Sequence, residues 1–134
     1  MTDNYKDIDL ELEKVVFLYN AKEGNSGIYE LTWELAYYDL TIESKYNIAH
    51  KILTGLLSDR LVVLDKYSDL TLENKIETIP LDKTEDILNN PNSWYPCNEI
   101  VSMTLTEKGE NYLNEQVLLL GDRLNERWTG KKEI

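Results

Sequence analysis

The sequence contains one histidine and one cysteine, His50 and Cys97, the side chains best suited to act as a general base and a nucleophile. Catalysis by this pair would require the two side chains to lie within hydrogen-bond distance of each other. Nothing in the sequence brings them together. We therefore expect His50 to lie on the flank of a helix and Cys97 to be a partly buried loop thiol, and we expect no enzymatic activity.

Carboxylate side chains are so frequent, with 25 aspartates and glutamates, that the presence of any two of them does not indicate an acid–base pair. The segment DKYSDLTLE contains Asp65, Asp69 and Glu73, but it lacks the ligand spacing and the central glycine of an EF-hand calcium loop. A single cysteine excludes zinc sites that need two thiolates, and neither an HExxH motif nor a glycine-rich phosphate loop occurs. The sequence therefore predicts neither a metal ion nor a cofactor.

The 134 residues carry a formal net charge of -11, and 42% of them are hydrophobic. This length and apolar content predict one folded domain over residues 1–134. The negative charge opposes binding to nucleic acid and to anionic membranes, and it attracts basic partners. The first residues lack the basic and apolar regions of a signal peptide, and no apolar run is as long as a membrane span. We therefore expect a cytoplasmic protein with no membrane contact.

Helical spacing of apolar residues predicts four main helices, in residues 7–22, 26–41, 44–59 and from 106 toward 128. β-rich or alternating runs predict strands in residues 61–64, 75–79 and 100–105, and the last of these is expected to pair with the first. The expected fold is therefore α+β and mostly helical, with a small antiparallel β hairpin and a C-terminal helix.

A long, polar and acidic insertion is predicted over residues 68–98, and a frayed tail over residues 129–134. The insertion contains a predicted short helix around residues 84–89. Pro91 and Pro96 then predict an extended or turned chain around Trp94. Loops of this length tend either to be functional or to contain structure of their own.

Two passages resemble the winged helix-turn-helix regulators of the MarR and PadR types. NIAHKILTGLLSDRLVVLDKY, residues 47–67, is similar to their passage from the third helix into a strand, and MTLTEKGENYL, residues 103–113, is similar to their LTxxGxxxL closure. The stretch IYELTWELAYYD also resembles small bacterial winged-helix-like proteins without an assigned activity. The resemblance implies a single winged-helix-like domain whose β hairpin is the wing. Within the closure, Thr106 is placed to cap the last helix, and Gly109 indicates a close backbone approach.

Aromatic residues that could anchor a partner occur in two places. The predicted helix over residues 26–41 has more rings than a small core usually holds, so we expect some of them at the surface: Tyr29, Trp33, Tyr37 and Tyr38. The insertion has Trp94 and Tyr95.

In the insertion, Trp94 and Tyr95 follow the acidic residues Asp82, Glu85 and Asp86. Aromatic anchors ringed by acid suit a basic protein partner, such as a nuclease toxin neutralised by its immunity protein. In the other interpretation, Trp94 closes the core beneath the insertion and the acidic side chains face solvent. Our leading hypothesis is a non-enzymatic, acidic protein-interaction module that uses these five residues.

The alternative hypothesis is a winged-helix transcriptional regulator that binds DNA. It requires Lys45, Lys51 and Arg60 to be exposed together. Residues 61–99 carry three basic residues against eight acidic ones, so a wing formed by them would repel phosphates. For this reason we do not expect nucleic acid to be the partner.

A homodimer through the C-terminal helix is a further expectation. One apolar stripe of that helix could meet a second copy: Leu113, Val117, Leu120 and Leu124. The same stripe could equally be covered within the chain.

Overall fold

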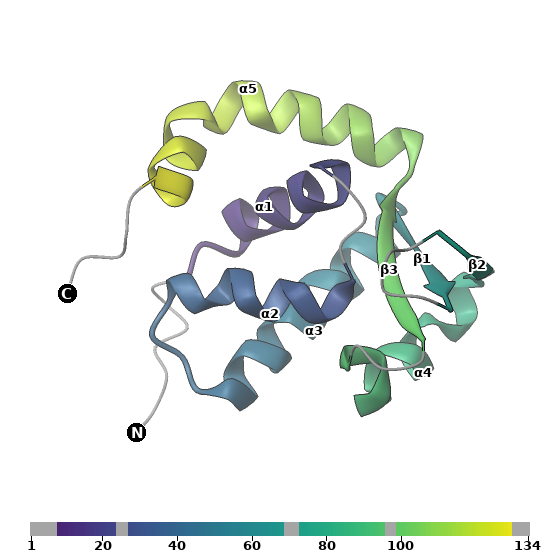
Figure 1. Cartoon of the computed structure of the whole chain (residues 1–134). Coiled ribbons are helices and arrows are strands. Elements are labelled where there is room, and N and C mark those ends of the chain that lie inside the picture. Colours follow the sequence, from purple (N-terminus) through teal and green to yellow (C-terminus); the bar gives the residue numbers. More distant parts are fainter. Residues whose placement is uncertain (1–7, 24–26, 69–72, 96–98, 130–134) are drawn as a thin grey trace.

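The computed structural model describes residues 8–23, 27–68, 73–95 and 99–129 (Figure 1). The chain has a mostly helical α+β fold with a three-stranded antiparallel sheet beside the helices. α1 (Leu10–Glu23) lies between α5 (Glu107–Thr129) on one side and α2 (Leu31–Glu34) and α3 (Ile42–Ser58) on the other (Figure 1). The predicted fold class is therefore confirmed.

α3 is the helix whose apolar stripe was clearest in the sequence. Its N-cap is Thr41, whose Oγ1 accepts a hydrogen bond from the backbone N–H of Ser44 at 3.1 Å, so the helix begins slightly before the predicted position. The stripe is buried in the core: Ile48, Ala49, Ile52, Leu53, Leu56 and Leu57. α1 is capped in the same way by Asp9, whose Oδ1 accepts a hydrogen bond from the N–H of Leu12 at 3.1 Å.

The helix predicted over residues 26–41 is instead three short segments: η2 (Ile28–Glu30), α2 and η3 (Leu35–Tyr37). The segment is rich in aromatic residues and threonine, which are weaker helix formers than alanine or leucine. The chain leaves the helical conformation at Tyr38 (φ -101°, ψ 154°), whose hydroxyl donates to the buried Glu13 at 2.7 Å. The predicted cap at Ser26 lies outside the described residues.

The sheet has the order β2-β1-β3, with β1 (Val62–Tyr67) at its centre and β2 (Lys75–Ile79) and β3 (Ile100–Leu105) at its edges. β1 and β3 pair antiparallel from Val62 opposite Leu105 to Tyr67 opposite Ile100, which confirms the predicted pairing. The strand predicted over residues 75–79 is also present, and it pairs antiparallel with the other side of β1. Its register shifts between Lys66 and Tyr67, which leaves Ile76 as an unpaired extra residue in β2.

One buried carboxylate joins all three strands. Asp65 of β1 is only 3% exposed, and it accepts hydrogen bonds from Thr78 of β2 at 2.6 Å and from Thr104 of β3 at 2.7 Å. A buried carboxylate is costly unless it is hydrogen-bonded or paired, and here the two hydroxyls and the Lys75 ammonium, 3.7 Å from Asp65 Oδ1, together offset that cost.

The long insertion is largely helical between β2 and β3. It contains η4 (Leu81–Lys83), α4 (Thr84–Asn89) and η5 (Pro91–Trp94). The prediction of a short helix around residues 84–89 is confirmed, and the turned segment near Trp94 is a 3-10 helix in which Asn90 caps the N–H of Asn92 at 3.0 Å. The insertion folds back, so that η5 packs against η2, and α4 packs against α3.

α5 begins after Thr106, whose Oγ1 accepts a hydrogen bond from the N–H of Gly109 at 3.0 Å, as the closure motif led us to expect. The helix is interrupted at Leu120 (φ -109°, ψ 15°), next to Gly121, and its last turns bend around the start of α1 (Figure 1). Leu113 and Leu124 are each 1% exposed, so the apolar stripe of α5 is covered within the chain. Within the described residues, no helix is both long and apolar enough to cross a lipid bilayer.

Candidate interaction surface

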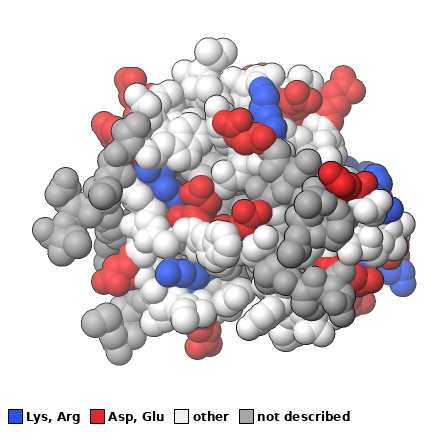
Figure 2. Space-filling view, in the orientation of Figure 1, with Lys and Arg blue, Asp and Glu red and all other residues white. Residues whose placement is uncertain are grey.

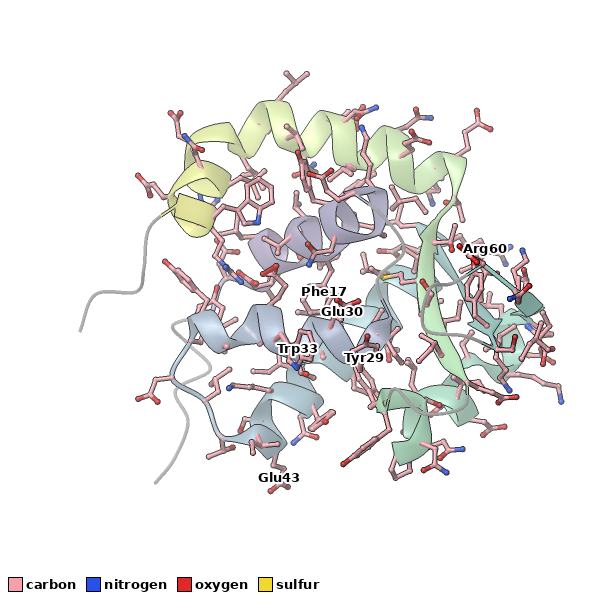
Figure 3. The ribbon with its side chains drawn as sticks, in the orientation of Figure 1. Phe17, Tyr29, Glu30, Trp33, Glu43 and Arg60 are labelled. Atoms are coloured by element: carbon pink, nitrogen blue, oxygen red, sulfur yellow. The ribbon has the colours of Figure 1, made fainter. Side chains whose placement is uncertain are left out.

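The partly buried Tyr29 and the exposed Trp33 form an aromatic pair on η2 and α2 (Figure 3). Their ring centroids lie 5.5 Å apart at an interplanar angle of 84°, and Trp33 is 65% exposed. The Tyr29 ring covers Gly27 so closely that a Cβ atom on Gly27 would lie 2.5 Å from Tyr29 Cε1. The Glu30 carboxylate fixes the turn from Gly27 into η2 by accepting a hydrogen bond from the N–H of Gly27 at 3.0 Å. Partial burial, and secondly the charge of Glu30, raise the pKa of Tyr29.

Trp94 is a core residue in this structure. It is 7% exposed, its Nε1 donates a hydrogen bond to the carbonyl oxygen of Leu88 at 2.9 Å, and its ring meets the edge of Tyr46 at a centroid distance of 5.7 Å. The structure therefore agrees with the second interpretation of Trp94, in which the ring closes the core beneath the insertion. Trp94 cannot be an exposed anchor, because η5 directs its indole inward. Tyr95, the next residue, is 67% exposed.

The packing of η2 against η5 places the segment that carries Tyr29 beside the segment that ends before Tyr95. We call the exposed or partly exposed rings of Tyr29, Trp33, Tyr46 and Tyr95 the aromatic face. It combines rings from η2 and α2 with a ring from α3 and another from the end of η5. The sequence indicated that some rings of residues 26–41 would be exposed, but not that they would join the insertion.

Acidic side chains also occur in the segments that carry the rings of the aromatic face. Glu30 lies beside Tyr29 and Trp33 in Figure 3, and Figure 2 shows acidic side chains gathered in the middle of the same side of the molecule. All three acidic residues predicted in the insertion are exposed on η4 and α4, and none of them pairs with a basic residue among the described residues: Asp82, Glu85 and Asp86. The insertion thus carries one exposed ring, Tyr95, and three exposed carboxylates.

A buried ionic network lies behind α2. Arg127 of α5 is 6% exposed and binds the fully buried Glu13 of α1 through Nε at 2.9 Å and Nη2 at 3.0 Å. Arg127 Nη2 also donates to the carbonyl oxygen of Glu34 at 2.7 Å, and the guanidinium lies 4.2 Å from the centroid of the Tyr37 ring. Sequence reasoning did not find this network. The one available signal was an acidic residue, Glu13, inside the apolar stripe of α1.

The electrostatics of the network favour its charged form. Burial alone would lower the pKa of Arg127, but the hydrogen bonds and charge of Glu13, and secondly the charge of Glu34, outweigh this, so that the pKa is raised. Burial, and then the hydrogen bond to Glu13, raise the pKa of Tyr38 well above its ordinary value. Tyr38 is therefore a neutral hydrogen-bond donor and Arg127 a cation at any physiological pH.

The three basic residues of the DNA-binding alternative do not share one face. Lys45 and Lys51 are six residues apart on α3, which places them about 120° apart around the helix axis. Lys51 borders a cavity of about 330 Å³ that is also lined by Ile8, Leu10, Asn47 and Ile48. Arg60 follows the helix in a left-handed conformation (φ 60°) and lies far from Glu43 at the start of α3 (Figure 3).

The side of α3 that bears His50 is partly covered. His50 Nε2 lies 3.0 Å from Asn89 Oδ1 at the end of α4, so the only histidine has a structural hydrogen-bond partner. Cys97, the other residue considered for catalysis, lies outside the described residues. Across the described ranges, no group of three or more histidine, cysteine or acidic side chains is placed to hold a metal ion.

No protein-family model, no curated protein and no solved structure matches this chain.

Proposed function

We propose that this chain is a non-enzymatic interaction protein that binds a basic protein partner through the aromatic face. The observation that supports the proposal is the exposure of Trp33 and Tyr95, at 65% and 67%, on neighbouring segments, because η2, which directly precedes α2, packs against η5. Large aromatic side chains lose little conformational entropy on binding and supply most of the energy at many interfaces. Trp33 takes the anchoring role that the sequence had suggested for Trp94.

The acidic residues have a different role in the proposal. Asp82, Glu85 and Asp86 lie at the rim, where charges mainly raise the association rate and select against acidic partners. The formal net charge of -11 acts in the same direction. A nuclease toxin held by its immunity protein is one pairing with this chemistry, because nucleases that bind phosphates present basic surfaces.

A winged-helix origin remains part of the proposal. It is supported by the order of the elements and by the isolated bridge between Gly27 and Ser102 of β3. The close approach of Gly109 to the backbone of Leu61 is a further point in its favour. DNA binding by a regulator of this type is the alternative function. It has less support, since the basic side chains diverge and α4 packs against α3.

Self-association through α5 would need other residues than the predicted stripe. On the outer side of α5, Leu118 and Leu119 are 86% and 75% exposed. Two leucines on one turn form a small patch compared with stable dimer interfaces, which bury about 800 Å² per partner. We therefore propose a monomer that uses the aromatic face.

The test is binding to an array of short synthetic peptides in which net charge and aromatic content vary independently. We expect basic peptides to bind and acidic peptides of equal length to fail. Trp33→Ala and Tyr95→Ala should each weaken binding by about tenfold or more, the loss of a hot-spot residue. Leu118→Ala removes an equally exposed apolar side chain from α5 and is the matched control. Equal binding of basic and acidic peptides, or equal losses in all three variants, would overturn the proposal.

A further inference from the structure

The last turns of α5 form a separate arm. We define the terminal arm as residues 121–129, which follow the interruption of the helix at Leu120. Its contacts with α1 are mostly polar or aromatic: Arg123 pairs with Asp9, Arg127 pairs with Glu13, and Trp128 stacks on Tyr19 at a centroid distance of 4.6 Å. In the arm, Leu124 is the apolar residue that is fully buried.

Arg127 ties this arm to α2 as well as to α1. Its Nη2 donates to the backbone carbonyl of Glu34 at 2.7 Å and lies 3.4 Å from the Glu34 carboxylate. Glu34 is the last residue of α2 and directly follows Trp33. The carbonyl groups toward the C-terminal end of a helical segment carry partial negative charge, so a cation there is favourable. Arg127 therefore holds the backbone next to Trp33, at the junction between α2 and η3.

α2 depends on such contacts for its orientation. It has four residues and is continuous with η2 before it and η3 after it, and the whole run over residues 28–37 is still shorter than a helix needs to be stable alone. On its inner side, Leu31 and Thr32 are buried. At its C-terminal end, the contact partner is the guanidinium of Arg127. Loss of this contact would leave the direction of Trp33 to the buried side chains of the run, chiefly those of Ile28, Leu31 and Leu35.

We infer that Arg127 is a positioning residue for the aromatic face. By holding the end of α2 it sets the direction of Trp33, so that docking of the terminal arm controls the surface that the partner meets. This inference rests on the proposed function for its biological meaning, but the positioning itself can be measured without a partner. Lysine cannot replace Arg127, because a planar guanidinium is needed to reach both Glu13 oxygens and the Glu34 carbonyl at once.

The experiment compares Arg127→Lys with Arg123→Lys in ¹⁵N-labelled protein. The side-chain N–H resonances of Trp33, Trp94 and Trp128 report the aromatic face, the core under the insertion and the arm. We expect Arg127→Lys to shift the resonances of Trp33 and Trp128 and to leave that of Trp94 unchanged. Arg123→Lys, which alters an exposed pair on the same arm, should leave Trp33 unchanged. The amide of Leu35, bonded at the end of α2, should exchange at least about tenfold faster in Arg127→Lys alone.

Two further variants separate positioning from a general loss of stability. Asp65→Asn weakens the sheet without touching α2. Even if it lowers the thermal midpoint as much as Arg127→Lys does, it should not move the Trp33 resonance. Glu13→Gln keeps the shape of the partner of Arg127 but removes its charge, and it should move Trp33 in the same direction by less. An unmoved Trp33 resonance in Arg127→Lys, or an equal shift in Asp65→Asn, would overturn the inference.

Binding links the inference to the proposed function. Against the tightest-binding basic peptide of the array, we expect Arg127→Lys to weaken binding about tenfold and Arg123→Lys to change it less than about twofold. If no basic peptide binds, the proposed function fails, while the resonances still decide whether Arg127 positions Trp33. If peptides bind but Arg127→Lys moves Trp33 without weakening them, the arm does not control the binding surface.

Discussion

Gly109 of α5 lies directly against the backbone of Leu61, where the chain enters β1. A Cβ atom on Gly109 would lie 1.9 Å from the carbonyl oxygen of Leu61, and the same oxygen accepts a hydrogen bond from the N–H of Thr106 at 3.0 Å. The start of the last helix and the start of the first strand thus share one contact that only glycine permits.

Gly109→Ala is expected to destabilise the protein by about 1–3 kcal/mol, the usual cost of forcing extra volume into a close contact. In a free helix the same change would be favourable by about 1 kcal/mol. Gly55→Ala is the control, since Gly55 lies in α3 with nothing within 4 Å of an added Cβ, and we expect it to gain about 0.5–1 kcal/mol. Urea denaturation of both variants measures the difference, and equal effects would contradict the close approach.

Trp94→Ala should destabilise the protein by about 3–5 kcal/mol, because it removes a buried ring and leaves the Leu88 carbonyl without its indole donor. Tyr95→Ala, at the neighbouring exposed position, should change the free energy of unfolding by no more than about 0.5 kcal/mol. Thermal and urea unfolding of the two single variants provide the test. A stable Trp94→Ala protein would show that the ring is not part of the core.

Glu13→Ala should cost about 3–5 kcal/mol, because it leaves the buried Arg127 without its main counter-charge. Glu11→Ala on the same helix removes an exposed partner of Lys14 and should cost at most about 1 kcal/mol. The two residues lie about half a turn apart on α1, so the variants differ mainly in burial. Similar losses in the free energy of unfolding, measured by urea denaturation, would mean that the network contributes no more than a surface ion pair.

The raised pKa of Tyr38 predicts a loss of stability at alkaline pH. The folded state favours the neutral phenol, so this contribution is complete below the ordinary tyrosine pKa of about 10 and is lost as the pH rises above it. Tyr38→Phe should flatten the fall of the thermal midpoint in this range, with a smaller slope remaining from Tyr29. Tyr95→Phe is the exposed control. A profile that is equally steep in Tyr38→Phe and the parent protein would contradict the role of this phenol.

Labelled mixed-sequence duplex DNA should show no rise in fluorescence anisotropy with this protein, either at low or at physiological salt. The reason is geometric as well as electrostatic, since Lys45 and Lys51 point about 120° apart. Binding that weakens steeply with salt would instead support the regulator alternative, because phosphate contacts release counterions.

Features fixed by local pattern could be predicted from the sequence. The α3 stripe, the pairing of β1 with β3 and the glycine in the closure each depend on spacing within a few residues or on alternation. The partner of Tyr38 where the second helix ends could not be predicted, because its hydroxyl bonds to Glu13 across 25 residues. Arg127 and Glu13 are 114 residues apart. The burial of the Trp94 side chain could not be decided from the sequence, since an aromatic residue between two prolines fits a core or a surface.

The extra residue at Ile76 also limits how this protein can associate. β2 is an edge strand, and such edges offer a ready template for strand addition from another chain. Here the bulge twists the edge, and Lys75 and Glu77 place charges on either side of it. A partner that added a strand here would have to interrupt its row of main-chain hydrogen bonds at Ile76. Recognition by main-chain pairing is therefore disfavoured at the β2 edge, and association is left to side chains.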